Sequence, residues 1–236
     1  MKIDYSILSV NDNPLYSDFW DLNKRFWYEY IGIKPMLVYI NKTKEAIEED
    51  DDSLIFYIRE VPNVDSGFQT QISRLYVTQF FPNDVLITSD IDMFPLSKTY
   101  FNNIVENIPN DKLAILSSDA YPSSAVRYPI CYNVGKGNTF DNILDLELNF
   151  SIFCDKMLKY GWGWDTDEKY LGMKVNEKKD KCVFLNRGWE NGIASKRLDR
   201  VVWGYNKNQD YIDCHSLRPY KQYKGEIDNL IKNYLK

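Results

Sequence analysis

The stretch Asp84-Val85-Leu86-Ile87-Thr88-Ser89-Asp90-Ile91-Asp92 decides the fold of this chain. An apolar run bounded by polar residues is typical of a central strand in a parallel sheet. In open α/β sheets, ligands bind just beyond the carboxyl ends of such strands. Two aspartates at that edge concentrate negative charge. A hard divalent cation is the simplest partner, because it can share its remaining positions with substrate phosphates. The stretch therefore predicts a metal-bridged nucleotide site.

The first hundred residues alternate expected strands with expected helices. We expect strands at 3–10, 35–40 and 54–58 and helices at 16–31 and 67–81. The second helix carries Arg74 on its polar face. The acidic run at 48–52 is expected to be a solvated loop. This alternation predicts βαβ units with right-handed crossovers, and hence an α/β fold with a mostly parallel central sheet flanked by helices.

Beyond residue 97 the pattern is less regular. We expect helices at 98–107, 139–160 and 226–235 and strands at 113–116 and 129–134. From Gly161 the chain is rich in tryptophan, glycine and charge, and helical periodicity returns only near its end. With 236 residues and no clear linker, residues 1–236 are expected to form a single domain.

Composition excludes several classes of protein. The chain is 44% hydrophobic and 15% aromatic, which argues for a folded globule. Its net charge of −5 does not favour nucleic-acid binding. The four cysteines lie far apart with no Cys-x-x-Cys pair, so reduced thiols are expected. There is no apolar run of the roughly 18 residues that a transmembrane helix needs, and the N-terminus lacks a signal-peptide pattern. We expect a soluble, cytoplasmic protein.

Asp90 and Asp92 form the first candidate site. In a strand, residues i and i+2 point to the same face, so both carboxylates are expected to approach one ion. The alternative is a turn pair that caps the following segment, because aspartate is common where strands end.

The segment Gly161-Trp162-Gly163-Trp164-Asp165-Thr166-Asp167-Glu168 is the second candidate. Glycines let the backbone approach a ligand, and tryptophans supply flat apolar walls. Three carboxylates beside such walls suit a general base whose pKa is raised by burial. The alternative is a helix N-terminus capped by Asp165 or Thr166.

Two further groups of residues bear on the same chemistry. His215 is the only histidine, and near Asp90 and Asp92 it is a candidate metal ligand. Arg218 and Lys221 follow it and are candidates for holding phosphate. Asn11 and Asp12 end the first expected strand, where a base and ribose are expected to lie.

These residues resemble the motifs of nucleotide-sugar-dependent glycosyltransferases of the GT-A fold. Ser89-Asp90-Ile91-Asp92 is similar to the Asp-x-Asp motif of that family, which holds Mn²⁺ or Mg²⁺ against the diphosphate of the donor. Ser9-Val10-Asn11-Asp12 looks like its nucleotide-binding edge. The resemblance implies that the donor-binding residues are Val10, Asn11, Asp12, Arg74, Ser89, Asp90, Asp92, Arg218 and Lys221.

Two later segments resemble different branches of that family. The segment from Gly161 to Glu168 looks like the Gly-Trp-Gly-plus-acids segment of some inverting members. This implies acceptor binding by Trp162, Gly163, Trp164 and Glu168 and a base at Asp165 or Asp167. Thr166 departs from the pattern, because an acid is expected there. His215 through Tyr220 is similar to a segment commoner in retaining members, in which the histidine completes the metal site of Asp90 and Asp92. The stereochemical outcome stays open.

The resemblance implies a metal-dependent, hexosyltransferase-type enzyme. It would use a nucleotide-diphosphate sugar, a UDP-sugar first, as co-substrate and Mn²⁺ or Mg²⁺ as cofactor. The acceptor would be a hydroxyl group on a glycan, protein or lipid. Residues 1–97 would bind the nucleotide, and residues 98–236 would bind the acceptor, with a lid at 203–225. One alternative is a sugar-phosphate nucleotidyltransferase, although the glycine-rich basic loop of that class is absent from 9–16. Another is a non-catalytic, carbohydrate- or partner-binding relic of the fold.

Overall fold

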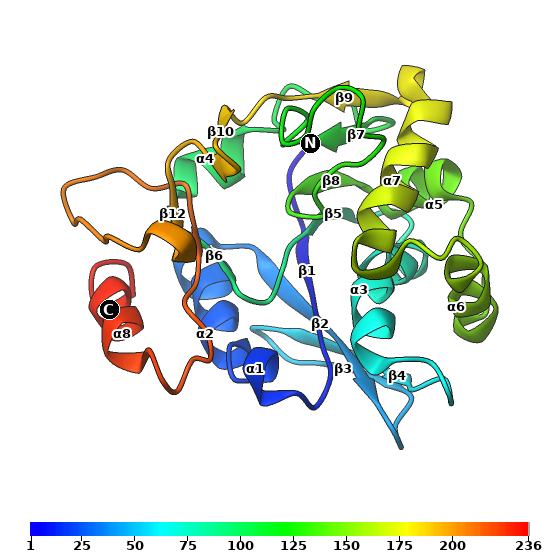
Figure 1. The fold of residues 1–236 in the computed structure, drawn as a ribbon, viewed down its shortest axis with the longest axis horizontal. Coiled ribbons are helices and arrows are strands. Elements are labelled where there is room, and N and C mark those ends of the chain that lie inside the picture. The colour runs from blue at the N-terminus through cyan, green and yellow to red at the C-terminus, as the bar shows by residue number, and fades with distance from the viewer. Residues whose placement is uncertain (236) are drawn as a thin grey trace.

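An eight-stranded mixed sheet forms the centre of the molecule (Figure 1). The structure is a computed structural model, and it describes residues 1–235. In spatial order the strands are β3 (Ala46–Glu49), β4 (Leu54–Arg59), β2 (Lys34–Asn41), β1 (Tyr5–Val10), β5 (Val85–Thr88), β8 (Asn133–Lys136), β7 (Leu113–Ile115) and β9 (Cys182–Phe184). The four strands β4, β2, β1 and β5 run parallel, whereas β3 and β8 are antiparallel to their neighbours.

A second, three-stranded sheet joins distant parts of the chain. Its order is β12 (Arg197–Asp199), β13 (Asp213–His215) and β6 (Met93–Pro95). In its register, His215 lies opposite both Met93 and Asp199. Because β6 directly follows Asp92, this sheet fixes the C-terminal third of the chain beside the end of β5. A short hairpin of β10 (Trp189–Glu190) and β11 (Ile193–Ala194) precedes it.

Helices cover both faces of the central sheet. One side carries α1 (Pro14–Ser17), α2 (Trp20–Arg25) with the π-helical turn Phe26–Ile31, α4 (Lys98–Asn103) and α8 (Lys224–Ile231). The other side carries α3 (Ser66–Tyr76), α5 (Gly137–Leu144), α6 (Phe150–Leu158) and α7 (Thr166–Glu177), on the right in Figure 1. Short 3₁₀ turns lie at Val77–Phe80, Gly163–Asp165, Lys179–Lys181 and Arg200–Val202. Within residues 1–235, no helix combines the length and apolar character needed to cross a membrane.

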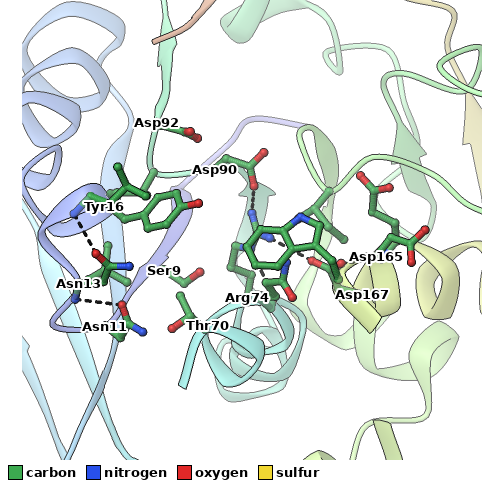
Figure 2. A pocket seen from close by; sticks show the side chains of 18 of the residues that line it. Ser9, Asn11, Asn13, Tyr16, Thr70, Arg74, Asp90, Asp92, Asp165 and Asp167 are labelled. Carbon is green, nitrogen blue, oxygen red and sulfur yellow. Dashed lines mark hydrogen bonds and ion pairs between the residues drawn. The ribbon is translucent and has the colours of Figure 1, made fainter. Parts of the chain in front are cut away.

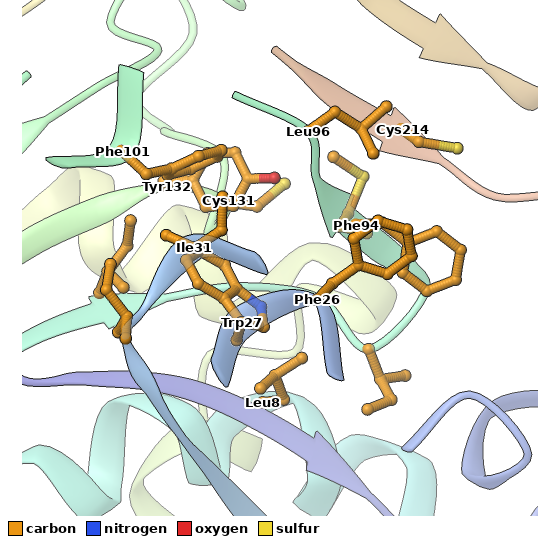
Figure 3. Close-up of a cluster of buried hydrophobic side chains, with 14 of the residues drawn as sticks. Leu8, Phe26, Trp27, Ile31, Phe94, Leu96, Phe101, Cys131, Tyr132 and Cys214 are labelled. Carbon is orange, nitrogen blue, oxygen red and sulfur yellow. The ribbon is translucent and has the colours of Figure 1, made fainter. Parts of the chain in front are cut away.

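The hydrophobic core is divided by the sheet into two clusters. Ile7 belongs to one cluster and Leu8 to the other, because successive strand residues point to opposite faces. Figure 3 shows the aromatic cluster around Leu8, where the ring of Phe26 stacks on that of Phe94 with centroids 5.1 Å apart. In the same cluster the indole of Trp27 meets the ring of Phe101 edge-on. Phe19, Phe26 and Trp27, from the expected helix at 16–31, are therefore core residues.

The expected fold class and most of the early elements are confirmed. The sheet is mostly parallel in its first half, and the expected strands at 3–10, 35–40 and 54–58 correspond to β1, β2 and β4. One expectation there is wrong. The acidic run is not wholly a loop, because Glu48 and Glu49 lie in the edge strand β3, where exposed carboxylates are tolerated.

Later expectations need three corrections. The expected helix at 139–160 is two helices, because Asp145 adopts a left-handed conformation (φ 49°) and Asn149 caps the start of α6. The expected strand at 129–134 begins only at Asn133. Helix α7 was not expected as a helix, although a helix start at Asp165 or Thr166 was considered. Its few buried apolar residues are interrupted by Gly172 and lysines, so its periodicity is weak.

Candidate functional site

A cavity of about 600 Å³ opens at the carboxyl ends of β1 and β5. Its walls come from both halves of the chain. Figure 2 shows Tyr16 and Asp92 on one side of the cavity, Asp165 and Asp167 on the other, and Arg74 and Asp90 between them. Further lining residues are Ser9, Val10, Asn11, Asn13, Thr70, Gln71, Tyr121, Arg127, Trp164, Glu168, Arg200, His215 and Arg218. This is the edge at which α/β sheets bind ligands.

Arg74 occupies the middle of the cavity floor. Its buried guanidinium, carried on α3, forms an ion pair with Asp90 and a second with Asp167 at 3.0 Å. Burial would raise the pKa of Asp90, but the charge and hydrogen bond of Arg74, together with smaller contributions from Cys131 and His215, lower it. At Asp167 burial prevails, and the pKa of this carboxyl is raised despite the same arginine. One cation thus ties the Asp-x-Asp segment to the start of α7.

Asp92 faces a different set of basic groups. Its Oδ2 accepts hydrogen bonds from Nη1 of Arg200 at 2.6 Å and from Nη1 of Arg218 at 3.3 Å. Nη1 of Arg218 also donates to the hydroxyl of Tyr16 at 2.6 Å. The expectation that Asp90 and Asp92 share one face of a strand is wrong, because β5 ends at Thr88 and residues 91–92 form a turn.

The side chains of Asp92 and His215 offer an oxygen and a nitrogen ligand that suit a divalent cation. Nδ1 of His215 lies 3.1 Å from Oδ2 of Asp199, and its Nε2 lies 3.8 Å from Oδ2 of Asp92. A carboxylate that holds one ring nitrogen leaves the other available as a ligand, which is the usual arrangement around metal-binding histidines. Asp90 is turned toward Arg74, and among residues 1–235 no three such side chains converge on one point. The residues present fit a cation through Asp92 and His215.

The start of α7 forms the opposite wall. Gly161 and Gly163 have positive φ angles of 62° and 74°, which residues with a Cβ rarely adopt, and they turn the chain into the helix. Asp165 pairs with Arg127 at 2.6 Å and with Lys169 at 3.0 Å. Partial burial would raise the pKa of Asp165, but these cations lower it. Asp165 is therefore held as a carboxylate.

Glu168 is a second carboxyl group in this wall whose pKa is raised by burial. Its Oε2 accepts a hydrogen bond from the hydroxyl of Tyr121 at 2.7 Å. Burial raises the pKa of Glu168 to about 7, with Asp167 adding to the rise, although the bond from Tyr121 opposes it. The guanidinium of Arg127 stacks over the ring of Tyr121, 3.8 Å from its centroid. The chain thus places a half-buried, proton-exchanging group in the cavity wall.

The two tryptophans of this segment have different environments. The indole of Trp164 lines the cavity and is 70% exposed, so it presents a free aromatic face. Trp162 stacks on Tyr160 with centroids 4.3 Å apart, packs against the core and is not among the cavity-lining residues. Trp164 is thus the tryptophan of this segment that is open to a ligand.

Several predicted site residues lie outside the cavity wall. Lys221 is exposed and pairs with Asp18 on the surface. Asp12 accepts a hydrogen bond from the hydroxyl of Tyr39. The cavity lining also omits Ser89, which is fully buried, and Trp162 and Gly163. The structure brings together Val10, Asn11, Arg74, Asp90, Asp92, Trp164, Asp165, Asp167, Glu168, His215 and Arg218.

Four ionisable residues of the cavity were not foreseen from the sequence as site residues. Tyr16 and Arg200 flank Asp92, and Tyr121 and Arg127 flank Glu168. Tyr16 was assigned to a helix start, whereas Tyr121 and Arg127 lie in an irregular segment that carries no motif. Arg200 directly follows Asp199, the carboxylate that orients His215. Arg200 is brought near His215 by the pairing of β12 with β13. The sequence alone does not reveal that pairing.

Comparison with known proteins rests on structure alone. No protein-family model matches the sequence, and no curated protein sequence matches it significantly. The galactosyltransferase LgtC, solved with donor and acceptor sugar analogues, aligns over 98% of this chain and 96% of its own at a TM-score of 0.55 and 7% identity. A glycosyltransferase involved in glycosylation of the major capsid of PBCV-1 aligns over 96% of this chain and 99% of its own, at a TM-score of 0.52 and 13% identity.

A third structure is similar only in part. The glycosyltransferase GlyE of Streptococcus pneumoniae TIGR4 is 10% identical at a TM-score of 0.45, and the chain spans 45% of its length, which is too weak a likeness for an inference. The other two alignments cover nearly the whole chain and include the sheet and the helices on both of its faces. The chain therefore has the mixed α/β fold of GT-A glycosyltransferases.

Proposed function

We propose that this protein is a glycosyltransferase that transfers a sugar from a nucleotide-diphosphate sugar to a hydroxyl acceptor. The observation that carries the proposal is one cavity that joins three groups of residues. The end of β1 and Asp92 lie on one side of the cavity, and Asp165 and Asp167 lie on the other. The exposed indole of Trp164, which precedes Asp165, also lines it. Such a cavity suits a nucleotide diphosphate on the first side and an acceptor sugar on the second.

A divalent cation, Mn²⁺ or Mg²⁺, is proposed at Asp92 and His215, with Asp90 beside them. When bound, the cation supplies a positive charge that stabilises the leaving diphosphate. Asp199 orients His215 for this role by holding its other ring nitrogen. Oxygen ligands with one imidazole suit these ions, and both leave positions open for phosphate oxygens.

The donor would lie along the left wall of the cavity as drawn in Figure 2. Val10, Asn11 and Asn13 at the end of β1 are available for the base and ribose. Arg218 is oriented by the hydroxyl of Tyr16, 2.6 Å away, toward the position of the diphosphate. Its guanidinium matches two phosphate oxygens and offsets the charge that develops as the sugar–phosphate bond breaks. A UDP-sugar is the first donor to test.

The acceptor would lie on the exposed face of Trp164, because flat indole faces bind the apolar faces of sugar rings. In an inverting reaction Asp165 or Asp167 would accept the proton of the acceptor hydroxyl. The raised pKa of Asp167 supports it as the stronger base, whereas two cations hold Asp165 as a weaker one. Arg74, which pairs with Asp167, would orient this carboxylate.

The test is a binding screen. UDP, GDP and ADP are each added with Mn²⁺, with Mg²⁺ or with EDTA, and the melting temperature is recorded. A nucleotide at 100 times its Kd stabilises the folded state by about 2.7 kcal/mol, which is a shift of several degrees for a chain of this size. A metal-dependent shift with one nucleotide is the expected result. If none of the three shifts the melting temperature with either metal, the donor site is refuted.

Asp92→Asn tests the cation site directly. Removing the charge of Asp92 is expected to weaken the metal-dependent part of nucleotide binding at least tenfold. Asp111→Asn, which removes an exposed carboxylate that does not line the cavity, is the matched control and should bind as the wild type does. Metal-dependent binding that survives unchanged in Asp92→Asn would contradict the assignment. Nucleotide binding without sugar transfer to any acceptor would favour the non-catalytic relic.

A further inference from the structure

Two positively charged guanidinium groups share one carboxylate oxygen, Oδ2 of Asp92, so a single negative charge faces two positive ones. Two guanidinium groups donate to it, from Arg200 at 2.6 Å and from Arg218 at 3.3 Å. The Asp92 side chain is only 6% exposed, so water does little to screen this arrangement. The same Oδ2 lies 3.8 Å from Nε2 of His215. The oxygen that a cation would use is therefore already occupied by arginine.

The backbone, and not only the side chain, places Arg200 there. In the three-stranded sheet, Asp199 pairs with His215, and His215 pairs with Met93, which follows Asp92. Oδ1 of Asp199 accepts the backbone N–H of Val201 at 2.9 Å and starts the 3₁₀ turn that begins at Arg200. Two strand pairings and one cap thus place the Cα of Arg200 at the same end of this sheet as Asp92, two strands away. Its position does not depend on the choice of rotamer.

Arg200 and Arg218 are held differently. Arg218 donates to the hydroxyl of Tyr16 at 2.6 Å, and its guanidinium also lies over the ring of Tyr16, 5.1 Å from the centroid. Within residues 1–235, Asp92 is the one side chain that forms a hydrogen bond or ion pair with the guanidinium of Arg200. Arg218 thus has a second anchor at Tyr16, whereas Arg200 has none besides Asp92. Arg200 is therefore the less constrained cation of this pair.

We propose that Arg200 couples the binding of the cation to the binding of the donor diphosphate, an inference that rests on the proposed function. A divalent cation at Asp92 and His215 takes Oδ2 and repels the guanidinium from it. The released guanidinium of Arg200 then binds two oxygens of the diphosphate, whose geometry it matches. Each ligand favours the arrangement that the other needs, so each raises the affinity of the other by the same factor. Arg200 acts as a binding residue for the diphosphate and as a competitor of the metal.

This coupling predicts effects of opposite sign in one variant. Arg200→Met keeps the length of the side chain and removes its charge. Mn²⁺ alone is expected to bind the variant several-fold more tightly, because Oδ2 of Asp92 is released. UDP in saturating Mn²⁺ is expected to bind about tenfold more weakly, because a charged hydrogen-bond donor is lost. The factor by which Mn²⁺ tightens UDP is therefore expected to fall.

The measurement is a set of calorimetric titrations of the full chain. Mn²⁺, UDP and inorganic pyrophosphate are titrated alone, and Mn²⁺ and UDP are each titrated in the presence of the other. Pyrophosphate reports on the diphosphate contact without a nucleobase. Arg200→Lys, which keeps the charge but lacks the fork, should retain part of the coupling. Lys207→Met removes an exposed positive charge from the same segment and is the matched control. A melting curve of each variant confirms that it folds.

The outcomes separate the inference from the function on which it rests. If the wild type binds neither UDP nor pyrophosphate with Mn²⁺, both are refuted. If the wild type binds UDP with Mn²⁺, and Arg200→Met shows the wild-type Mn²⁺ affinity and coupling factor, only the inference is refuted. Weaker UDP binding with unchanged Mn²⁺ affinity would also refute the coupling, since it would leave Arg200 as a simple phosphate contact.

Discussion

At the scale of single residues, Glu168 gives a pH dependence that can be measured without knowing the substrate. Its pKa of about 7 in the folded chain lies above the ordinary value of 4.5. Between these two values the folded state holds a proton that the unfolded state has lost. The free energy of unfolding therefore falls as pH rises through this window. Above pH 7 Glu168 is ionised in the folded chain, and the partial burial of this charge lowers the free energy of unfolding.

Glu168→Gln is expected to remove this dependence. From pH 5 to pH 8, the wild type should lose more stability than the variant, and the variant should be the more stable of the two at pH 8. Melting temperatures across this range provide the measurement. Glu190→Gln, at an exposed position outside the cavity, controls for the loss of one negative charge. Parallel pH profiles of the wild type and Glu168→Gln would contradict the assignment.

For single residues, the sequence predicted which side chains have chemistry suited to the site, but not which residues they contact. Asp90, Asp92 and His215 were selected because carboxylates and a histidine suit a cation, and all three line one cavity. That Asp92 contacts Arg200 and Arg218 was not foreseen, because the pairs are separated by 108 and 126 positions. Local pattern carries no information on such contacts, which depend on the pairing of β13 with β6 and with β12.

At the scale of elements, helix α7 supports the irregular segment that carries Tyr121 and Arg127. A Cβ atom at Gly172 would lie 2.5 Å from Cα of Arg127 and 2.6 Å from the carbonyl oxygen of Val126. Helix and segment approach so closely only because residue 172 has no side chain. The glycine that weakened the helical pattern in the sequence is thus what lets the wall of the cavity form.

Gly172→Ala is therefore expected to destabilise the chain by about 1–3 kcal/mol, even though alanine favours helices. Gly225→Ala in α8, where a Cβ meets nothing within 4 Å, is the matched substitution. It should stabilise by up to about 1 kcal/mol. Urea denaturation of both variants measures the difference. Equal effects of the two substitutions would show that the segment moves away without cost.

Elements were predictable where burial follows the period of the element. Strands β1, β2 and β4 are largely apolar runs, so pattern and structure agree. In the helix at 66–76, by contrast, residues 72–76 are all buried, including the polar Arg74. The strand with Asp90 and Asp92 was drawn too long, because a polar residue can belong either to the end of a strand or to the turn after it. Short strands such as β12 and β13 have too few residues to show a period.

At the scale of the whole molecule, the structure refines the expected lid at 203–225. Asp213, Cys214 and Ser216 are fully buried, and β13 is paired on both sides. Residues 206–210, in contrast, are exposed. A closing movement of the whole segment would break two strand pairings, whereas the residues on either side of β13 have no such constraint.

Hydrogen exchange can distinguish these parts. With UDP and Mn²⁺, protection is expected to increase at 200–210 and at 216–223, while the amides of β13 are already protected without ligand. Lys221→Ala, which removes an exposed residue paired with Asp18, should leave this change intact. An increase confined to β13, or no change on either side of it, would contradict the division of the lid.

The three-stranded sheet also sets the order in which the protein becomes competent during synthesis. Asn11 and Asp90, which follow β1 and β5, lie in the first hundred residues, but Asp199, Arg200, His215 and Arg218 lie in the last forty of this sequence. A nascent chain that has emerged from the ribosome only as far as residue 190 contains Asp90, Asp92 and the end of β1. It lacks the two arginines and the histidine that lie next to Asp92. Because chains emerge N-terminus first, the proposed nucleotide site can be completed only after residues 199–218 have been synthesised.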